Sequence, residues 1–181
     1  MWPLFVFLGI VVFIIICIVL SKYNKLVKLR NEVKQSRSGI DVYSEQRFDL
    51  IPNLVKTVKA YAAHEESVLK QITELRTQYM NTKDIATEAE LNNKINNILL
   101  IAENYPDLKA SRNFLNLQQN LTKIENELQA ARRIYNIDVT NYNTAIHTVP
   151  TNIIAGLFGF KEETLFEISD MQAKDNVKVN L

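Results

Sequence analysis

The stretch WPLFVFLGIVVFIIICIVL, residues 2–20, decides the fold because its nineteen residues include no charged side chain. As an α-helix it would be roughly 28 Å long, close to the thickness of the hydrocarbon core of a bilayer. A single segment can satisfy its backbone hydrogen bonds in lipid only as a helix. We therefore predict an uncleaved transmembrane anchor over residues 1–21, which contacts membrane lipid through residues 2–20.

Other interpretations of this stretch fit the sequence less well. A cleaved signal peptide has a basic n-region and a small-x-small exit, whereas no Lys or Arg precedes this run and Val19-Leu20-Ser21 is a poor exit. A lipoprotein signal needs a small residue before its cysteine, but Cys17 follows three isoleucines. A buried core helix would require later segments that could enclose a helix apolar on every side, and the later chain is too polar for that.

The charged residues begin directly after the apolar stretch. Residues 22–37 contain six basic side chains and one acidic one, whereas residues 38–181 are net acidic. Basic residues close to a spanning helix tend to stay in the cytoplasm, so we predict a cell-membrane protein with its N-terminus outside and its helical domain cytoplasmic. The cluster is either an ordinary solvated helix face or a site for anionic lipid headgroups. The candidate lipid contacts are Lys22, Lys25, Lys28 and Arg30.

The overall charge is nearly balanced, at +1 for the whole chain. A nucleic-acid-binding protein would show a clustered basic face on its folded domain, so we expect no nucleic-acid partner. The only cysteine, Cys17, lies inside the predicted span and leaves no thiol for disulfide or thiol chemistry in the domain.

The rest of the chain predicts an all-α fold, an antiparallel up-down bundle of about four long helices over residues 22–150. The helices are expected at about 21–47, from Pro52 to about residue 80, from Thr87 to about residue 102, and at about 108–148. Apolar residues recur every seven positions in them, as in Phe114, Leu121, Leu128, Tyr135 and Tyr142. Because such a stripe packs on other helices, it would also serve a homo-oligomer.

Two turn regions carry capping patterns. Asp49 precedes Pro52 and suits an N-cap, and Thr87 with Glu90 has the spacing of a capping box. An alternative, functional interpretation of the first turn is that it is exposed and presents Arg47, Phe48 and Asn53 to a protein partner.

The C-terminal region holds the apolar run Ile153–Phe160. One interpretation is that residues 151–171 pack on the bundle as core, with Leu165, Phe166 and Ile168 adding a short amphipathic turn. The other is that Leu157, Phe158 and Phe160 dock on a partner or insert at the membrane surface. Residues 172–181 are expected to form a flexible tail.

Several segments, in order, resemble the LemA family of bacterial membrane proteins. The most specific are DLIPNLV at 49–55 and AGLFGF at 155–160, joined by NYPDLKA at 104–110 and by the pairs Tyr135-Asn136 and Tyr142-Asn143. The resemblance implies a single-pass membrane protein with an all-α bundle, and it implies no enzymatic activity.

The residues themselves offer little for catalysis. His64-Glu65-Glu66 begins like a zincin motif but lacks the second histidine, and the other histidine is His147. We expect no enzyme, metal or cofactor. The predicted function is a membrane-anchored adaptor or scaffold with an unidentified protein partner; the alternative is an envelope-facing accessory subunit of a membrane protease or transport complex.

Overall fold

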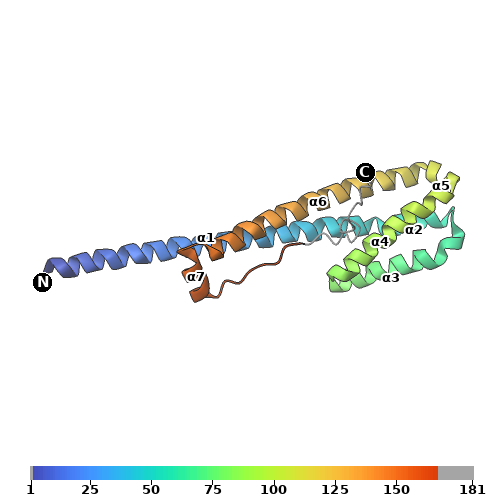
Figure 1. Cartoon of the computed structure of the whole chain (residues 1–181). Helices are drawn as coiled ribbons and strands as arrows, with labels where there is room; N and C mark the ends of the chain where they lie inside the picture. The colour runs from blue at the N-terminus through green and yellow to red at the C-terminus, as the bar shows by residue number, and fades with distance from the viewer. Residues whose placement is uncertain (1, 167–181) are drawn as a thin grey trace, which may run out of the picture. The chain divides into compact units, whose positions relative to one another are not determined.

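The computed structural model describes residues 2–166, and every regular element in that range is a helix. The predicted all-α fold is therefore confirmed. The predicted tail at 172–181 and Ile168 lie outside the described residues. The elements are α1 (Trp2–Asp49), α2 (Ile51–Lys59), the 3-10 turn η1 (Ala63–Glu65), α3 (Glu66–Thr82), α4 (Ile85–Ile101), the 3-10 turn η2 (Ala102–Asn104), α5 (Pro106–Ala110), α6 (Arg112–His147) and α7 (Thr151–Phe158) (Figure 1).

The chain divides into two compact units. One is residues 37–131, and the other combines residues 2–36 with the described residues from Arg132 onward. α1 and α6 each run through both units. We call residues 37–131 the central unit, and residues 2–36 together with the described residues from Arg132 onward the membrane-proximal unit.

In α1 the apolar stretch continues into the first helix of the domain without a break. Its apolar positions at intervals of seven, Leu26, Val33 and Ile40, are all buried. Gly39 leaves the helix intact, and a side chain there would meet no neighbour within 4 Å, so close helix approach does not explain this glycine.

The central unit is a helical bundle in which α3 packs on both α2 and α4 (Figure 1). Its core is a continuous apolar cluster, and burying such side chains is the main favourable term in folding. The turn between α3 and α4 is short, so the two helices are antiparallel neighbours. The largest contributors to this core are Phe48, Ile51, Leu54, Ile72, Tyr79, Leu91, Ile95, Ile98 and Leu108.

The single helix predicted from Pro52 to about residue 80 is wrong, because two helices with a turn between them occupy that range. α2 ends at Lys59, and the carbonyl oxygen of Val58 accepts hydrogen bonds from the amides of Tyr61 and Ala62 at 3.0 and 2.8 Å. Ala62 is fully buried at the reversal. The turn contains neither glycine nor proline, so no local sequence pattern indicated it.

Both predicted caps are also wrong. α2 has Leu50 at its N-cap position, and no side chain of residues 2–166 caps it. Asp49 instead forms an ion pair with Arg76, with 3.0 Å between Oδ1 and Nη2. α4 is capped by Asp84, which accepts a hydrogen bond from the Thr87 amide at 2.9 Å.

The last long helix begins slightly later than predicted. A short α5 ends at Ala110, and α6 starts at Arg112 with the first backbone bond running from the Leu115 amide to the Ser111 carbonyl. The apolar residues predicted at intervals of seven along α6 are confirmed as a buried stripe: Phe114, Leu121, Leu128, Tyr135 and Tyr142.

Candidate functional site

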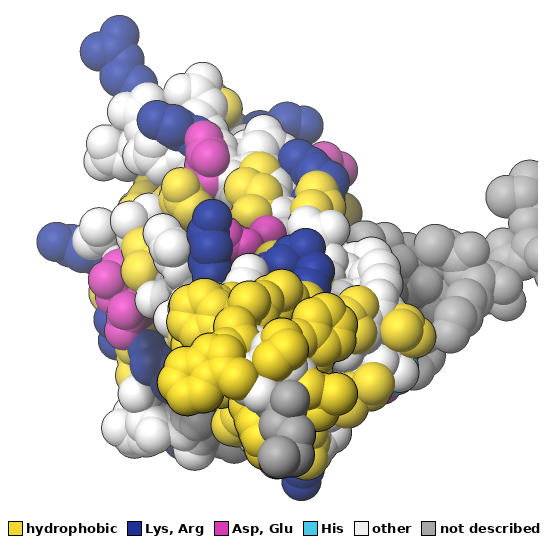
Figure 2. All heavy atoms as spheres, turned by 90° about the vertical axis from the view of Figure 1, so that its left-hand side faces the viewer, with side chains coloured by type: hydrophobic (Ala, Val, Ile, Leu, Met, Phe, Trp, Pro, Cys, Tyr) yellow, Lys and Arg dark blue, Asp and Glu magenta, His cyan; other side chains and the backbone are white. Residues whose placement is uncertain are grey.

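The membrane-proximal unit begins with the apolar half of α1. α1 is the one helix among the described residues that is long and apolar enough to cross a bilayer, judged by length and composition. Its side chains from Trp2 to Leu20 are all at least partly exposed, and Figure 2 shows a patch of hydrophobic side chains with basic and acidic side chains above and beside it. An apolar surface of this kind requires a lipid or protein environment.

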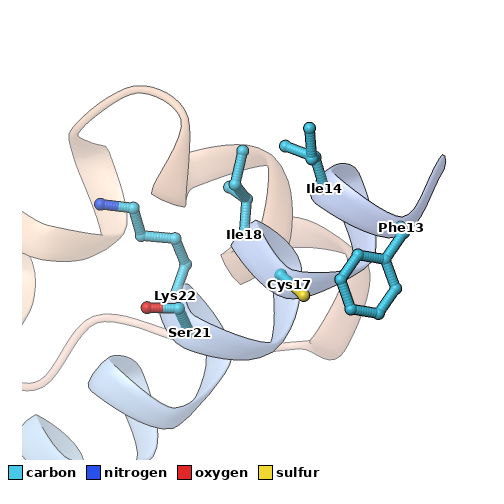
Figure 3. Close-up of a pocket in the computed structure, with 6 residues that line it drawn as sticks. All are labelled: Phe13, Ile14, Cys17, Ile18, Ser21 and Lys22. Atoms are coloured by element: carbon cyan, nitrogen blue, oxygen red, sulfur yellow. The ribbon is translucent and has the colours of Figure 1, made fainter. Parts of the chain in front are cut away.

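A hollow lies at the end of this apolar half (Figure 3). All its lining residues belong to α1 and share one helix face: Phe13, Ile14, Cys17, Ile18, Ser21 and Lys22. The hollow is mostly apolar and is formed by a single helix, so it offers few polar groups to a ligand.

The basic residues predicted to contact lipid follow on the same helix. Lys25 and Lys28 are exposed, and Lys22 and Arg30 are half-buried. Lys28 lies 3.8 Å from the Glu32 carboxylate, one helical turn further on. An exposed pair of this kind contributes little to stability, so the lysine charge remains available to the solvent.

An aromatic cluster joins α1 to the segment around α7. The Tyr23 ring centroid lies 4.8 Å from that of Phe158 and 5.8 Å from that of Phe160. The guanidinium carbon of Arg30 lies 5.1 Å from the Phe160 ring centroid, a cation–π contact. Phe160 is thus brought to another predicted site residue, Arg30, and Tyr23 contacts both Phe158 and Phe160.

Gly159 makes this arrangement possible. α7 ends at Phe158, and Gly159 adopts a left-handed φ of 70°, which other residues rarely accept. The chain then turns so that the Phe160 amide donates to the Ala155 carbonyl at 3.0 Å. The glycine of AGLFGF therefore places Phe160 back against α1.

α7 has one buried face and one exposed face. Ile154 and Ala155 are buried, as expected for core, whereas Ile153, Leu157 and Phe158 are 62%, 77% and 55% exposed. The interpretation of the whole Ile153–Phe160 run as core is therefore wrong for these three side chains. Leu157 and Phe158 remain candidates for contact with a partner or with lipid.

Beyond α7 the chain runs in extended form along α6 rather than forming the predicted amphipathic turn. Four side chains of α6, which we call the Tyr–Asn clamp, hold its backbone: Tyr135, Asn136, Tyr142 and Asn143. Asn143 donates to the Glu163 carbonyl at 2.8 Å and accepts from the Glu163 amide at 3.0 Å. Asn136 donates to the Phe166 carbonyl at 3.1 Å and accepts from the Phe166 amide at 2.8 Å.

The two tyrosines add hydroxyl bonds to the same backbone. Tyr142 donates to the Lys161 carbonyl and Tyr135 to the Thr164 carbonyl, each at 2.9 Å. Burial raises the pKa of Tyr142, nearby Arg30 lowers it, and Glu163 raises it further. Sequence reasoning assigned these tyrosines to the core but missed the clamp. The signal for it was the Tyr-Asn pair repeated seven residues apart.

In the central unit, Arg47 and Phe48 are buried rather than displayed at an exposed turn, so that expectation is wrong. Arg47 is 5% exposed and donates to Asn92 Oδ1 at 2.7 Å and to the Glu125 carboxylate. Phe48 packs edge-on against Tyr79, with 4.7 Å between ring centroids. Asn53 is the one member of this predicted set that is exposed.

A second buried polar contact lies between α1 and α4. Ser44 donates to Glu88 at 2.9 Å, and both residues are buried. Desolvation, followed by the charge of Glu88, raises the pKa of the neighbouring Tyr79 to about 12. Tyr79 is therefore neutral at any physiological pH, and the Ser44–Glu88 bond holds α1 and α4 together.

With this geometry described, the sequence comparisons decide the family. A sequence model of the LemA family matches residues 36–181. The chain belongs to the LemA family. The matched range includes α7 and the Tyr–Asn clamp but begins after the apolar half of α1.

Individual relatives of this LemA-family chain include two kinds of protein. Protein LemA of Metamycoplasma hominis is 28% identical over 160 residues, which cover 86% of this chain and 73% of the relative. Magnetosome protein MamQ 2 of Paramagnetospirillum magneticum is 22% identical over 190 residues, which cover 88% of this chain and 69% of the relative. Magnetosome protein MamQ of Magnetospirillum gryphiswaldense is 21% identical over 177 residues, which cover 81% of this chain and 65% of the relative.

The histidines and acidic residues of this LemA-family chain bear on whether it could hold a metal. Among the described residues, no three His, Cys, Asp or Glu side chains gather as metal ligands would. His64 is exposed, and His147 contacts the Glu162 carboxylate at the surface. Together with the apolar helix, the family match identifies a membrane-associated protein with a helical domain.

Proposed function

We propose that the protein is a non-enzymatic, single-pass membrane adaptor whose helical domain binds a partner protein close to the bilayer. The observation that carries the proposal is that the buried polar side chains bind one another inside the bundle. Arg47, Ser44 and Glu88 contact other side chains within the bundle, so their charge and hydrogen-bonding capacity stabilise helix positions. A rigid scaffold of this kind suits the presentation of a binding surface.

An exposed apolar pair on α6 supports a protein-binding surface. Ile134 and Ile137 lie about one helical turn apart and are 54% and 58% exposed. They lie on the outer side of α6, whereas Tyr135, Val139 and Tyr142 are buried. Exposed aliphatic neighbours of this kind fit the apolar centre of a protein interface.

The orientation we propose is N-terminus outside and helical domain in the cytoplasm. Its support is the excess of basic residues directly after the span, including the exposed Lys25 and Lys28. Within this orientation the partner is a cytoplasmic or membrane protein.

The adaptor function is tested by photo-crosslinking of the full chain in living cells. A benzophenone amino acid replaces Ile137 in one strain and the exposed Asn126 of the same helix in a matched control. We expect one discrete light-dependent adduct from position 137, its loss when Ile134→Asp is added, and no such adduct from position 126. The proposal is overturned if position 137 gives no adduct, or if its adduct is a dimer of this chain.

A further inference from the structure

We propose that α7 lies in the membrane interface and inserts Ile153, Leu157 and Phe158 among the lipid acyl chains, beside the point where α1 leaves the bilayer. The occupant of this apolar face is thus the phospholipid surface itself. The inference rests on the apolar half of α1 and is independent of the adaptor function. It gives the domain a second attachment to the membrane in addition to the spanning helix.

The first step is the composition of α7. The sequence TNIIAGLF has no charged residue. Its inner face is anchored by the buried Ile154 and Ala155, while Ile153 and Leu157, four residues apart, share the outer face. An uncharged helix with an exposed apolar face is costly in water and stable at a lipid–water boundary.

The second step is the position of α7. The ring of its last residue, Phe158, packs at a tilt against that of Tyr23, which follows the apolar stretch by only three residues. In Figure 1, α7 lies at the end of α6 nearest to the apolar part of α1. Three residues of helix rise by roughly 4.5 Å, so Tyr23, which Phe158 contacts, lies within one helical turn of the hydrocarbon boundary that Leu20 marks. Tyrosine is also a residue favoured at that boundary.

The third step is the charge around α7. Lys25, Lys161 and the half-buried Lys22 flank the apolar face in sequence or on α1, and Arg30 lies over the Phe160 ring. The acidic Glu162 and Glu163 follow Lys161, and Glu162 contacts His147. Each lysine or arginine near an anionic membrane surface contributes about 1 kcal/mol of attraction. Apolar insertion combined with basic flanks fits a lipid surface better than the apolar centre of a protein interface, which is depleted of lysine.

The fourth step is that α7 is held in place. Tyr142 and Asn143 of the Tyr–Asn clamp bind the backbone at Lys161 and Glu163, directly after Phe160. Gly159 closes the end of the helix through the bond from Phe160 to Ala155. The apolar face is therefore presented in a fixed position rather than on a free tail.

The experiment measures the membrane depth of single spin labels on the full chain, reconstituted in phosphatidylcholine–phosphatidylglycerol vesicles. Cys17→Ser removes the native thiol, and the label is attached at Leu157→Cys or, as a control, at Ile134→Cys. Both positions are exposed leucine or isoleucine side chains of the same unit. The control lies on α6, roughly 20 Å along the helix from its C-terminal end.

Depth is measured by two collision rates of the spin label. One is with oxygen, which concentrates in lipid, and the other is with a water-soluble nickel chelate; a higher ratio of the first to the second means a deeper label. We expect a ratio several-fold higher at position 157 than at position 134. Equal, water-accessible labels at the two positions would overturn the proposal. A label at 157 that is shielded from both reagents, and becomes accessible when the protein is diluted in the vesicles, would overturn it in favour of a second copy of this chain.

Discussion

Arg47 shows how a single residue positions several helices of the central unit. Its guanidinium is nearly fully buried and binds Asn92 on α4 and Glu125 on α6. A buried guanidinium is tolerated only when its donors are satisfied, because its desolvation is costly. Three helices must therefore keep their spacing for this one side chain to remain paired.

The Arg47→Met variant keeps most of the apolar volume but leaves the Glu125 carboxylate without its partner. We expect the free energy of unfolding to fall by about 2–3 kcal/mol, somewhat less than for a fully buried pair, because Glu125 keeps some solvent contact. Chemical denaturation of the full chain in detergent, followed by far-ultraviolet circular dichroism, measures the change.

Lys70→Met is the matched control for this measurement. Lys70 pairs with Glu74 at 3.8 Å, and both side chains are largely exposed. Exposed pairs contribute about 1 kcal/mol or less, so this variant should unfold nearly as the parent does. A loss for Arg47→Met no larger than that for Lys70→Met would show that the buried contact has no stabilising role.

At the scale of the element, the Tyr–Asn clamp joins a helix to an extended segment through repeated contacts. Asn136 and Asn143 each bind both the amide and the carbonyl of one residue, seven positions apart on α6 and three positions apart on the segment. Seven residues make two turns of helix, so both side chains project from the same face. An extended residue advances roughly 3.3 Å, and three of them span most of that rise.

Each asparagine should protect only the amide that it binds. In Asn143→Ala, we expect hydrogen exchange at the Glu163 amide to accelerate by about thirtyfold, since two bonds of about 1 kcal/mol each are lost. The Phe166 amide should change little. Asn136→Ala should reverse the two results, so each variant is the control for the other. Equal acceleration at both amides in either variant would show that the segment detaches as a whole.

The elements show which features the sequence could predict. Spacing by sevens placed Leu26, Val33, Phe114 and Leu128 correctly in buried positions, because burial on a helix follows directly from its period. The cap predicted at Asp49 was missed because its partner is distant, since Asp49 pairs with Arg76, twenty-seven residues later. α4 is instead capped locally, by Asp84 three residues before Thr87. The clamp was missed for a similar reason, since Asn143 binds backbone atoms that carry no side-chain signature.

At the scale of the whole molecule, orientation in the membrane separates the two functions considered for this chain. The adaptor requires the helical domain in the cytoplasm, whereas an envelope-facing subunit requires it outside. The charge asymmetry favours the cytoplasm, because six basic residues and one acidic residue follow the span within sixteen positions. The α7 proposal holds on either side, since it requires only a bilayer surface.

A single cysteine reports this orientation once Cys17→Ser has removed the native thiol. Asn81 is exposed near the end of α3, so Asn81→Cys places a reactive thiol on the helical domain without disturbing its core. We expect a membrane-impermeant maleimide to leave it unlabelled in intact cells and to label it after lysis. Trp2→Cys, at the other end of the span, should give the opposite result and label in intact cells. If Asn81→Cys is labelled in intact cells while Trp2→Cys is protected, the basic residues do not set the topology, and the envelope-facing function replaces the adaptor.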